Sequence, residues 1–198
     1  MTEDYLKAIY AHTEWQPDPI GSSQLAHWLG LAPSSVTEMV KKLVRQGLVV
    51  HAPYGAIELT ASGRSEALRI VRRHRLVETW LVQQFGYGWD EVHDEAEVLE
   101  HTLSDRLLDA IDSQLGHPTL DPHGDPIPAT DLTMPEFHGV PASALFPGSL
   151  GRVVRISDRD PAVLRQLAAA GVGLGSVLAA GELDEDVAGA VWVRGAVD

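Results

Sequence analysis

The sequence predicts a mainly α-helical chain with small β parts, on three observations. Apolar residues recur at three- and four-residue steps through most of the first 115 positions, which is the spacing of amphipathic helices. Short apolar runs separated by proline and glycine follow within the first third and are typical of a small hairpin. The last third is rich in valine, which favours strands, and in glycine, which favours the turns between them. A length of 198 residues accommodates one to three small domains.

The first third predicts a winged helix-turn-helix. The expected elements are a helix over residues 2–13, a short helix that Ser22 or Ser23 caps and that ends at Gly30, a helix from Pro33 to Gly47, and strands at 48–50 and 57–60 around the turn Pro53-Tyr54-Gly55. Proline suits the first turn of a helix, and glycine suits the position after its last turn. Two helices joined by a short glycine-containing turn and followed by a hairpin are the layout of a DNA-binding module with a wing.

The helix that begins at Pro33 carries the side chains expected to contact DNA: Ser34, Ser35, Thr37, Glu38, Lys41 and Lys42. Hydroxyl groups at a helix N-terminus bond phosphates and touch base edges, and lysines pair with phosphates. The alternative is a plain helical hairpin whose serines only cap a helix. The wing favours the DNA-binding interpretation.

Negative charge is concentrated in the middle third. The chain has 15 basic and 28 acidic side chains and a formal net charge of −13. Residues 65–137 hold five basic and fifteen acidic side chains, a net charge of −10, together with five histidines. Such a segment is either a solvated acidic surface or a set of oxygen and nitrogen ligands for a cation. The overall acidity argues against a protein that coats nucleic acid in general.

Histidines and carboxylates recur at helical spacing in this acidic segment. A long helix is expected from Thr60 to about Phe85, and its His74 and Glu78 share one face because they lie four residues apart. A second helix, expected to open near residue 90, carries four such side chains within an arc of about 100°: His93, Glu97, Glu100 and His101. Its two glutamates would repel each other without a cation. We therefore predict metal ligands on both helices, although a single histidine alone would be interpreted as structural.

An apolar stripe accompanies these ligands along the second helix: Val92, Ala96, Leu99, Leu103, Leu107, Ile111 and Leu115. With the apolar residues of the preceding helix it forms more apolar surface than two helices can bury against each other. We therefore expect a homodimer built mainly through the middle third. Its two-fold symmetry would set the two DNA-contacting helices about one DNA turn, roughly 34 Å, apart.

Four runs of sequence carry a resemblance to a known family: Asp4-Tyr5-Leu6-x-x-Ile9-Tyr10, Arg73-His74-Arg75-Leu76-Val77-Glu78, Val92-His93-Asp94-Glu95-Ala96-Glu97-Val98-Leu99-Glu100-His101-x-x-Ser104-Asp105, and Asp121-Pro122-His123-Gly124-Asp125-Pro126-Ile127-Pro128. They resemble the diphtheria-toxin-repressor family of metal-dependent transcriptional regulators, over nearly the whole chain. The resemblance implies a three-domain form with an N-terminal winged helix-turn-helix, a helical dimerisation domain and a C-terminal SH3-like β-barrel.

The resemblance also implies two metal sites per subunit. The primary site would use Asp4, Glu97, Glu100 and His101, and the ancillary site would use His74, Glu78 and His93. The barrel of this family lends side chains to the ancillary metal, and Asp158 stands at the matching place after a predicted strand. Asp160 is the weaker candidate, and solvation of a loop is the alternative for both.

Asp4 and Glu97 set the expected metal. The iron-responsive branch has methionine and cysteine at these positions, whereas the manganese-responsive branch has carboxylates, as here. Mn²⁺ is a hard ion that prefers oxygen with some imidazole, and sulfur ligands favour softer ions. The resemblance therefore implies the manganese-responsive branch, with Mn(II) as cofactor and Fe(II) as the alternative. Lys7 stands where two-domain members have a second acid that bridges two ions, so two separated sites are expected.

Three domains are expected, at residues 1–62, at 63–136 with a proline-rich linker to 147, and at 148–198. Seven of the twelve prolines lie in residues 117–147, which predicts an extended linker without a fold of its own. In the last domain, strands are expected at 151–156, 177–179 and 190–193, and a short helix at 161–170.

These features predict a manganese-dependent DNA-binding transcriptional regulator, a repressor of metal-uptake genes whose Mn(II) corepressor fixes the dimer in a DNA-competent conformation. Double-stranded operator DNA and a second copy of the chain are the expected partners, with no small-molecule substrate. No catalytic residue is assigned, because no catalytic zinc helix, phosphate-binding loop or nucleophile triad is recognisable. The alternatives are an iron-responsive regulator of the same family or, in a different class, a metal-dependent enzyme or a metal-buffering protein.

The absence of cysteine excludes disulfides, thiolate zinc sites, iron–sulfur clusters and cysteine nucleophiles. No apolar run approaches 18 residues, and the first residues lack the basic-then-apolar layout of a signal peptide. We therefore expect a cytoplasmic protein without a membrane partner.

Overall fold

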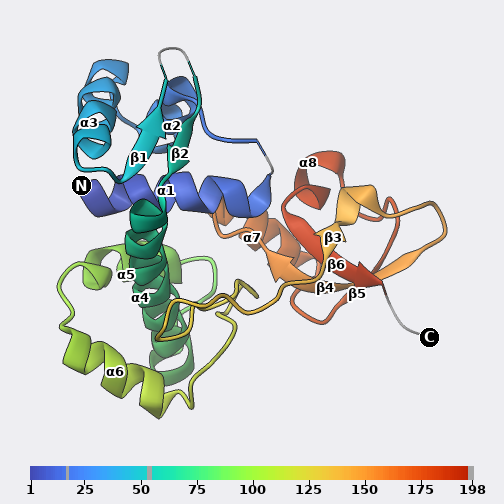
Figure 1. The fold of residues 1–198 in the computed structure, drawn as a ribbon. Helices are drawn as coiled ribbons and strands as arrows, with labels where there is room; N and C mark the ends of the chain where they lie inside the picture. Colours follow the sequence, from blue (N-terminus) through green and yellow to red (C-terminus); the bar gives the residue numbers. More distant parts are fainter. Residues whose placement is uncertain (17, 53–54, 196–198) are drawn as a thin grey trace. The chain divides into compact units, whose positions relative to one another are not determined.

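The computed structural model describes residues 1–16, 18–52 and 55–195. The chain forms two compact units. The N-terminal unit comprises residues 1–72 with 130–132, and the C-terminal unit runs from Arg73 to Ala129 and from Thr133 onward. Over the described residues, helices and two small sheets make up a mainly α fold with small β parts, as predicted (Figure 1). None of the described helices is both long and apolar enough to cross a bilayer.

The N-terminal unit has the expected order of a helix-turn-helix followed by a wing. Its elements are α1 (Thr2–Trp15), α2 (Ser22–Trp28), α3 (Pro33–Arg45), β1 (Val49–His51), β2 (Ile57–Leu59) and the first half of α4 (Ala61–Phe85). The two strands pair antiparallel, with Val49 opposite Leu59. Residues 53 and 54 of the expected turn lie outside the described residues.

Local chemistry explains where these helices begin and end. Pro33 stands in the first turn of α3, and Gly47, with a φ of 70°, follows its last turn. Neither Ser22 nor Ser23 caps α2, so that expectation is wrong. The cap position is Gly21, whose backbone N–H donates to Oε1 of Gln24 at 2.9 Å.

Two helices, not one, follow α4. The apolar stripe predicted a single helix from about residue 90 to 115, but the chain forms α5 (Val92–Glu100) and α6 (Asp105–Gln114). Ser104 explains the break, because its side chain accepts a hydrogen bond from the N–H of Leu107 and caps α6. The stripe is divided accordingly. Val92 and Ala96 pack with residues of α4 in one cluster, and Leu115, at the end of the stripe, packs against another.

The first part of the proline-rich segment is buried, so the expectation of a linker is wrong for it. Asp121, His123, Asp125 and Ile127 are all at most 6% exposed. Leu120 and Pro126 form a bridge that closes the loop. Proline restricts the backbone to extended and turn conformations, but it does not prevent burial when side chains find partners.

The C-terminal β-domain, residues 140–195, forms a four-stranded antiparallel sheet. Its strands are β3 (Val140–Pro141), β4 (Leu150–Ile156), β5 (Val177–Ala179) and β6 (Val191–Gly195), in the order β3-β6-β4-β5. Two helices, α7 (Pro161–Ala169) and α8 (Glu185–Ala188), and a 3₁₀ turn (Ala142–Ala144) complete it. The three expected strands and the helix are present, whereas β3 and α8 were not foreseen. The pairing of β4 with β6 shifts between Val153 and Arg155, as at a β-bulge.

Candidate functional site

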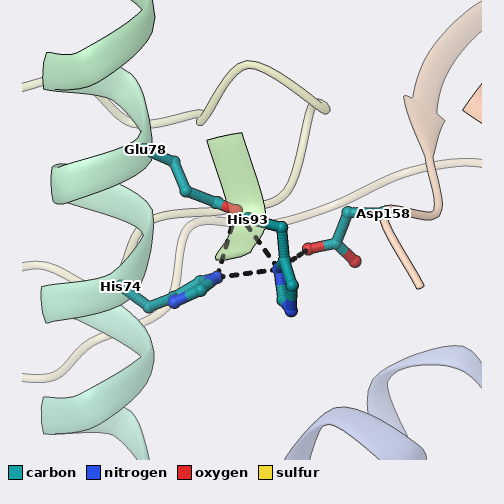
Figure 2. A group of neighbouring side chains, drawn as sticks. All are labelled: His74, Glu78, His93 and Asp158. Atoms are coloured by element: carbon teal, nitrogen blue, oxygen red, sulfur yellow. Dashed lines mark hydrogen bonds and ion pairs between the residues drawn. The ribbon is translucent and has the colours of Figure 1, made fainter. Parts of the chain in front are cut away.

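Four side chains from three segments of the C-terminal unit converge on one point. His74 and Glu78 lie one turn apart on α4, His93 lies in the first turn of α5, and Asp158 follows the end of β4 (Figure 2). One ligand atom from each lies within 4.8 Å of those of the other three. The structure thus brings together the three residues predicted for the ancillary site and Asp158. Asp160 is not in this group, since its side chain caps α7 by accepting from the N–H of Ala162 at 2.8 Å.

His93 is the centre of the group. Its Nδ1 lies 3.2 Å from Oδ2 of Asp158 and 3.4 Å from Oε1 of Glu78. The same atom lies 3.2 Å from Nε2 of His74. In Figure 2 the interactions drawn from all three partners meet at this ring. The arrangement offers two carboxylates and two imidazoles to a single small cation.

The charges in this group hold its carboxylates ionised and His93 protonated. Burial alone would raise the pKa of Glu78, but His74 and His93 outweigh it and hold that pKa below its usual value. Burial likewise raises the pKa of Asp158, and its bond to His93 and the nearby imidazole charges lower it further than burial raises it. Burial lowers the pKa of His93, but Asp158 and Glu78 raise it to about 10. A proton on His93 therefore supplies positive charge where a metal ion would otherwise supply it.

Buried polar atoms at the site fit a bound cation. Glu78 is fully buried, and among the described residues neither of its oxygens has a partner in hydrogen-bond geometry, although Oε1 lies 3.0 Å from Nε2 of His74. Within the same described ranges, Nδ1 of His123 is also buried without a hydrogen bond. Leaving such a group unsatisfied costs about 1–3 kcal/mol. A hard divalent cation would give the Glu78 carboxylate a partner, so the residues present fit one.

Asp121 and His123 were not predicted as ligands, yet they border the same carboxylate. Ligand atoms of Glu78, Asp121 and His123 lie within 4.8 Å of one another, and all three side chains are buried. His123 Nε2 donates to the backbone oxygen of Trp89 at 2.7 Å, which leaves Nδ1 facing inward. Burial, and then the carboxylates of Asp125 and Glu78, raise the pKa of Asp121 well above its usual value. The Asp-x-His spacing was visible in the sequence, but its burial was not.

The C-terminal unit also brings together two of the four ligands predicted for the primary site. Glu97 and Glu100 form a second group of potential ligands, with His74 as its third member. His101 Nε2 lies 3.5 Å from Oε1 of Glu100. Asp4, the fourth predicted ligand, lies on α1 in the N-terminal unit, where its carboxylate pairs with the amino group of Met1 at 2.8 Å.

His74 belongs to both groups because it uses both ring nitrogens. Its Nδ1 lies 2.6 Å from Oε2 of Glu100, and its Nε2 faces Glu78 and His93. When Nδ1–H donates to a carboxylate, the tautomer is fixed and Nε2 keeps a lone pair for a metal. Glu100 therefore orients a ligand of the neighbouring group.

The side chains predicted to contact DNA all lie at the surface of α3: Ser34, Ser35, Thr37, Glu38, Lys41 and Lys42. Glu38 accepts from Nζ of Lys41 at 2.8 Å, and the Thr37 hydroxyl donates to the backbone oxygen of Pro33 at 2.9 Å. The helix thus displays hydroxyl, acidic and basic groups together, which is the range of donors and acceptors that base edges and phosphates require.

Two family models match successive parts of the chain. The family model described as "Iron dependent repressor, N-terminal DNA binding domain" matches residues 1–57. The model described as "Iron dependent repressor, metal binding and dimerisation domain" matches residues 60–129.

Among curated relatives, the iron-dependent repressor IdeR of Mycobacterium leprae is 33% identical over 168 residues, which cover 84% of this chain and 71% of that protein. A solved manganese-dependent transcriptional repressor in complex with manganese is 45% identical, with a TM-score of 0.93, and the match covers 99% of this chain and 100% of that one. The manganese regulator SloR is 28% identical, with a TM-score of 0.84, over 98% of both chains. The family consists of transcriptional repressors and not of enzymes, as expected. The chain therefore belongs to the diphtheria-toxin-repressor family of metal-dependent transcriptional repressors.

Proposed function

We propose that the chain is a manganese-dependent repressor that binds operator DNA as a homodimer and uses Mn²⁺ as its corepressor. The observation that carries the proposal is the group of His74, Glu78, His93 and Asp158, two of them buried and two half-buried, whose donors are oxygen and imidazole nitrogen. Mn²⁺ prefers this donor set, and softer ions prefer sulfur, which the group lacks. The similarity to a repressor solved with manganese supports the same assignment.

Two metal sites per subunit are part of the proposal. The ancillary site consists of His74, Glu78, His93 and Asp158, and Asp121 and His123 are available around the shared carboxylate of Glu78. When a cation is bound there, it neutralises the crowded carboxylates and joins the middle of α4 to the first turn of α5 and to the segment after β4. For the primary site we propose Glu97, Glu100 and His101, completed by Asp4 from α1.

DNA binding is assigned to the exposed face of α3, and dimerisation to the helices of the C-terminal unit. Three large apolar side chains remain substantially exposed on α4, α5 and α6, namely Phe85, Val98 and Leu107, at 60%, 68% and 44%. Covering them with a second copy removes apolar surface from water. We place this regulator in the cytoplasm, where it would meet operator DNA upstream of metal-uptake genes.

An iron-responsive regulator is the second candidate, since the relative from Mycobacterium leprae is an iron-dependent repressor. Labelled DNA from upstream of the chain's own gene separates the candidates when its anisotropy is titrated with protein in EDTA, Mn²⁺, Fe²⁺ or Zn²⁺. The proposal expects Mn²⁺ to tighten DNA binding at least tenfold at free concentrations where Fe²⁺ does less. Equal DNA affinity in EDTA and Mn²⁺ would instead indicate a metal-buffering protein.

A further inference from the structure

Asp158 reaches the metal centre from a different part of the C-terminal unit than the other ligands. His74, Glu78 and His93 are carried by α4 and α5, whereas Asp158 follows β4 of the β-domain. Its distance of 3.2 Å from His93 therefore depends on how β4 is held against the helices. The contacts that join β4 to α4 decide whether this ligand is in place.

The carboxylate of Asp125 connects these two elements by charge. Oδ1 of Asp125 lies 3.3 Å from Nη2 of Arg75 on α4, and it also pairs with Nη2 of Arg155 on β4. All three side chains are less than a tenth exposed. Arg75 Nη1 additionally donates to the backbone oxygen of Pro126 at 2.6 Å, which holds the Asp125 loop on α4.

The geometry of β4 directs Arg155 towards this loop. The register shift between Val153 and Arg155 is accompanied by two consecutive buried residues, Arg155 and Ile156, where a regular strand would alternate. The guanidinium of Arg155 lies over the ring of Phe137, 5.5 Å from its centre. The next residue, Ile156, donates its N–H to the backbone oxygen of His123 at 2.9 Å, and Asp158 follows two residues later.

We propose that Asp125 is a positioning residue of the metal centre: by joining Arg75 to Arg155 it fixes the end of β4 and holds Asp158 at His93. The inference rests on the proposed function, because it assumes that Asp158 is a metal ligand. A neutral side chain at 125 leaves two buried guanidinium groups beside each other, with the carboxyl of Asp121 as the remaining acidic neighbour. Their repulsion displaces β4, since Arg75 is additionally held by the loop backbone.

The test measures Mn²⁺ affinity by isothermal titration of the full chain, in a His101→Ala background that disables the proposed primary site. Asp158→Ala should weaken Mn²⁺ binding by about ten- to a hundredfold, and Asp125→Asn and Arg155→Gln should each weaken it at least fivefold but by no more than Asp158→Ala, because they act through that ligand. The double variant Asp125→Asn with Asp158→Ala should bind within twofold of Asp158→Ala alone. Arg152→Gln, on the exposed side of the same strand, is the matched control and should not change the affinity.

The outcomes separate this inference from the proposed function. If Asp158→Ala weakens binding while Asp125→Asn and Arg155→Gln stay within twofold of the parent, the positioning role is wrong and the ligand role of Asp158 stands. Additive losses in the double variant also contradict positioning. If Asp158→Ala leaves the Mn²⁺ affinity unchanged, both the ligand role of Asp158 and the positioning role of Asp125 are overturned. Circular dichroism checks folding without metal, and Arg155→Gln carries the test if Asp125→Asn does not fold.

Discussion

Each ring nitrogen of His74 faces a different carboxylate. Nδ1 is bonded to Glu100 at 2.6 Å and Nε2 lies 3.0 Å from Glu78. Glu100 is proposed as a primary ligand and Glu78 as an ancillary one, so the histidine lies between the two ligand sets. A metal ion bound to Glu100 draws charge from that carboxylate and weakens the hydrogen bond that it accepts from Nδ1 of His74. The weaker hydrogen bond changes the donor strength of Nε2 on the same ring. We therefore expect the two proposed sites to be coupled through His74.

The first prediction concerns metal preference. Asp4→Met together with Glu97→Cys replaces two oxygen donors by sulfur, so the chain should move its preference towards softer ions such as Fe²⁺, Co²⁺ or Zn²⁺. DNA binding titrated with each metal gives the ranking for the variant and the parent. Asp94→Asn, an exposed change on the same helix as Glu97, serves as control. An unchanged ranking in the double variant would show that these positions do not set selectivity.

The second prediction concerns protons released by metal binding. Because the pKa of His93 is about 10, its imidazole is protonated at pH 7 in the metal-free protein and competes with Mn²⁺. The groups that face it are His74, Glu78, Glu97 and Asp158. Raising the pH removes the competing proton, so Mn²⁺ affinity should rise between pH 6 and 8, by up to about tenfold per unit for each proton released.

Titration calorimetry in buffers of different ionisation enthalpy measures this release directly. About one proton per ion at the ancillary site is expected from the wild type, and His93→Gln should lose it. His138→Gln, at an exposed histidine, should leave it unchanged. The same enthalpy in all buffers would contradict the protonated state of His93.

At the scale of elements, the loop over residues 119–127 shows why sequence alone did not reveal the whole site. Prolines at 118, 122, 126 and 128 suggested a linker, because composition reports backbone restriction and not burial. Asp121 and His123 are buried through partners far along the chain, such as the backbone oxygen of Trp89 and the carboxylate of Glu78. Such partners are not encoded in local spacing. His74, Glu78 and His93 could be found because helical periodicity places them.

The helices and strands also divide into those that local sequence marks and those that depend on distant partners. Most helices and strands could be predicted, because apolar spacing, Pro33 and the glycines mark them locally. The break between α5 and α6 could not, since the apolar stripe continues across it and only the cap at Ser104 interrupts the helix. The two-residue strand β3 has too little sequence for any pattern, and it forms because β6 pairs with it.

The third prediction tests the packing of the loop on β4. Gly124 has a φ of 84°, and a Cβ there would lie 2.2 Å from the backbone oxygen of Val154. Gly116, with a φ of 74°, has nothing within 4 Å of such a Cβ. Gly116→Ala should therefore lower the free energy of unfolding by about 1–2 kcal/mol, which is the strain of a left-handed backbone at alanine. Gly124→Ala should lower the free energy of unfolding by at least about 1 kcal/mol more, because its Cβ would clash with the backbone of β4.

Urea unfolding of both variants in EDTA gives the two losses of stability. Gly124→Ala should also weaken Mn²⁺ binding, because the loop carries Asp121 and His123, whereas Gly116→Ala should not. Equal losses of stability would mean that the loop is not packed on β4 as described.

At the scale of the whole molecule, the fourth prediction concerns the dimer. Val98→Glu and Leu107→Glu put charges on the exposed apolar positions of α5 and α6, so each should shift the protein towards monomer. Phe146→Glu, at a position of the β-domain that is 80% exposed, is the matched control and should leave the dimer intact. Sedimentation velocity at micromolar protein with Mn²⁺ gives the populations. A wild type that sediments only as monomer would refute the dimer.

The proposal joins the metal centre to DNA binding through the equilibrium between two conformations of the dimer. Mn²⁺ favours the DNA-competent state only if it binds that state more tightly than the other. A tenfold gain in DNA affinity corresponds to about 1.4 kcal/mol of coupling free energy. By reciprocity, DNA must tighten Mn²⁺ binding by the same total factor.

The most direct test of the central claim is therefore the Mn²⁺ binding isotherm of the full chain, recorded with and without saturating operator DNA. Manganese electron paramagnetic resonance reports the free ion in both titrations. The account predicts that DNA tightens Mn²⁺ binding, and that the factor, summed over the sites, equals the gain in DNA affinity produced by Mn²⁺. Unchanged Mn²⁺ affinity in the presence of operator DNA would contradict the account, even if the chain binds both ligands tightly.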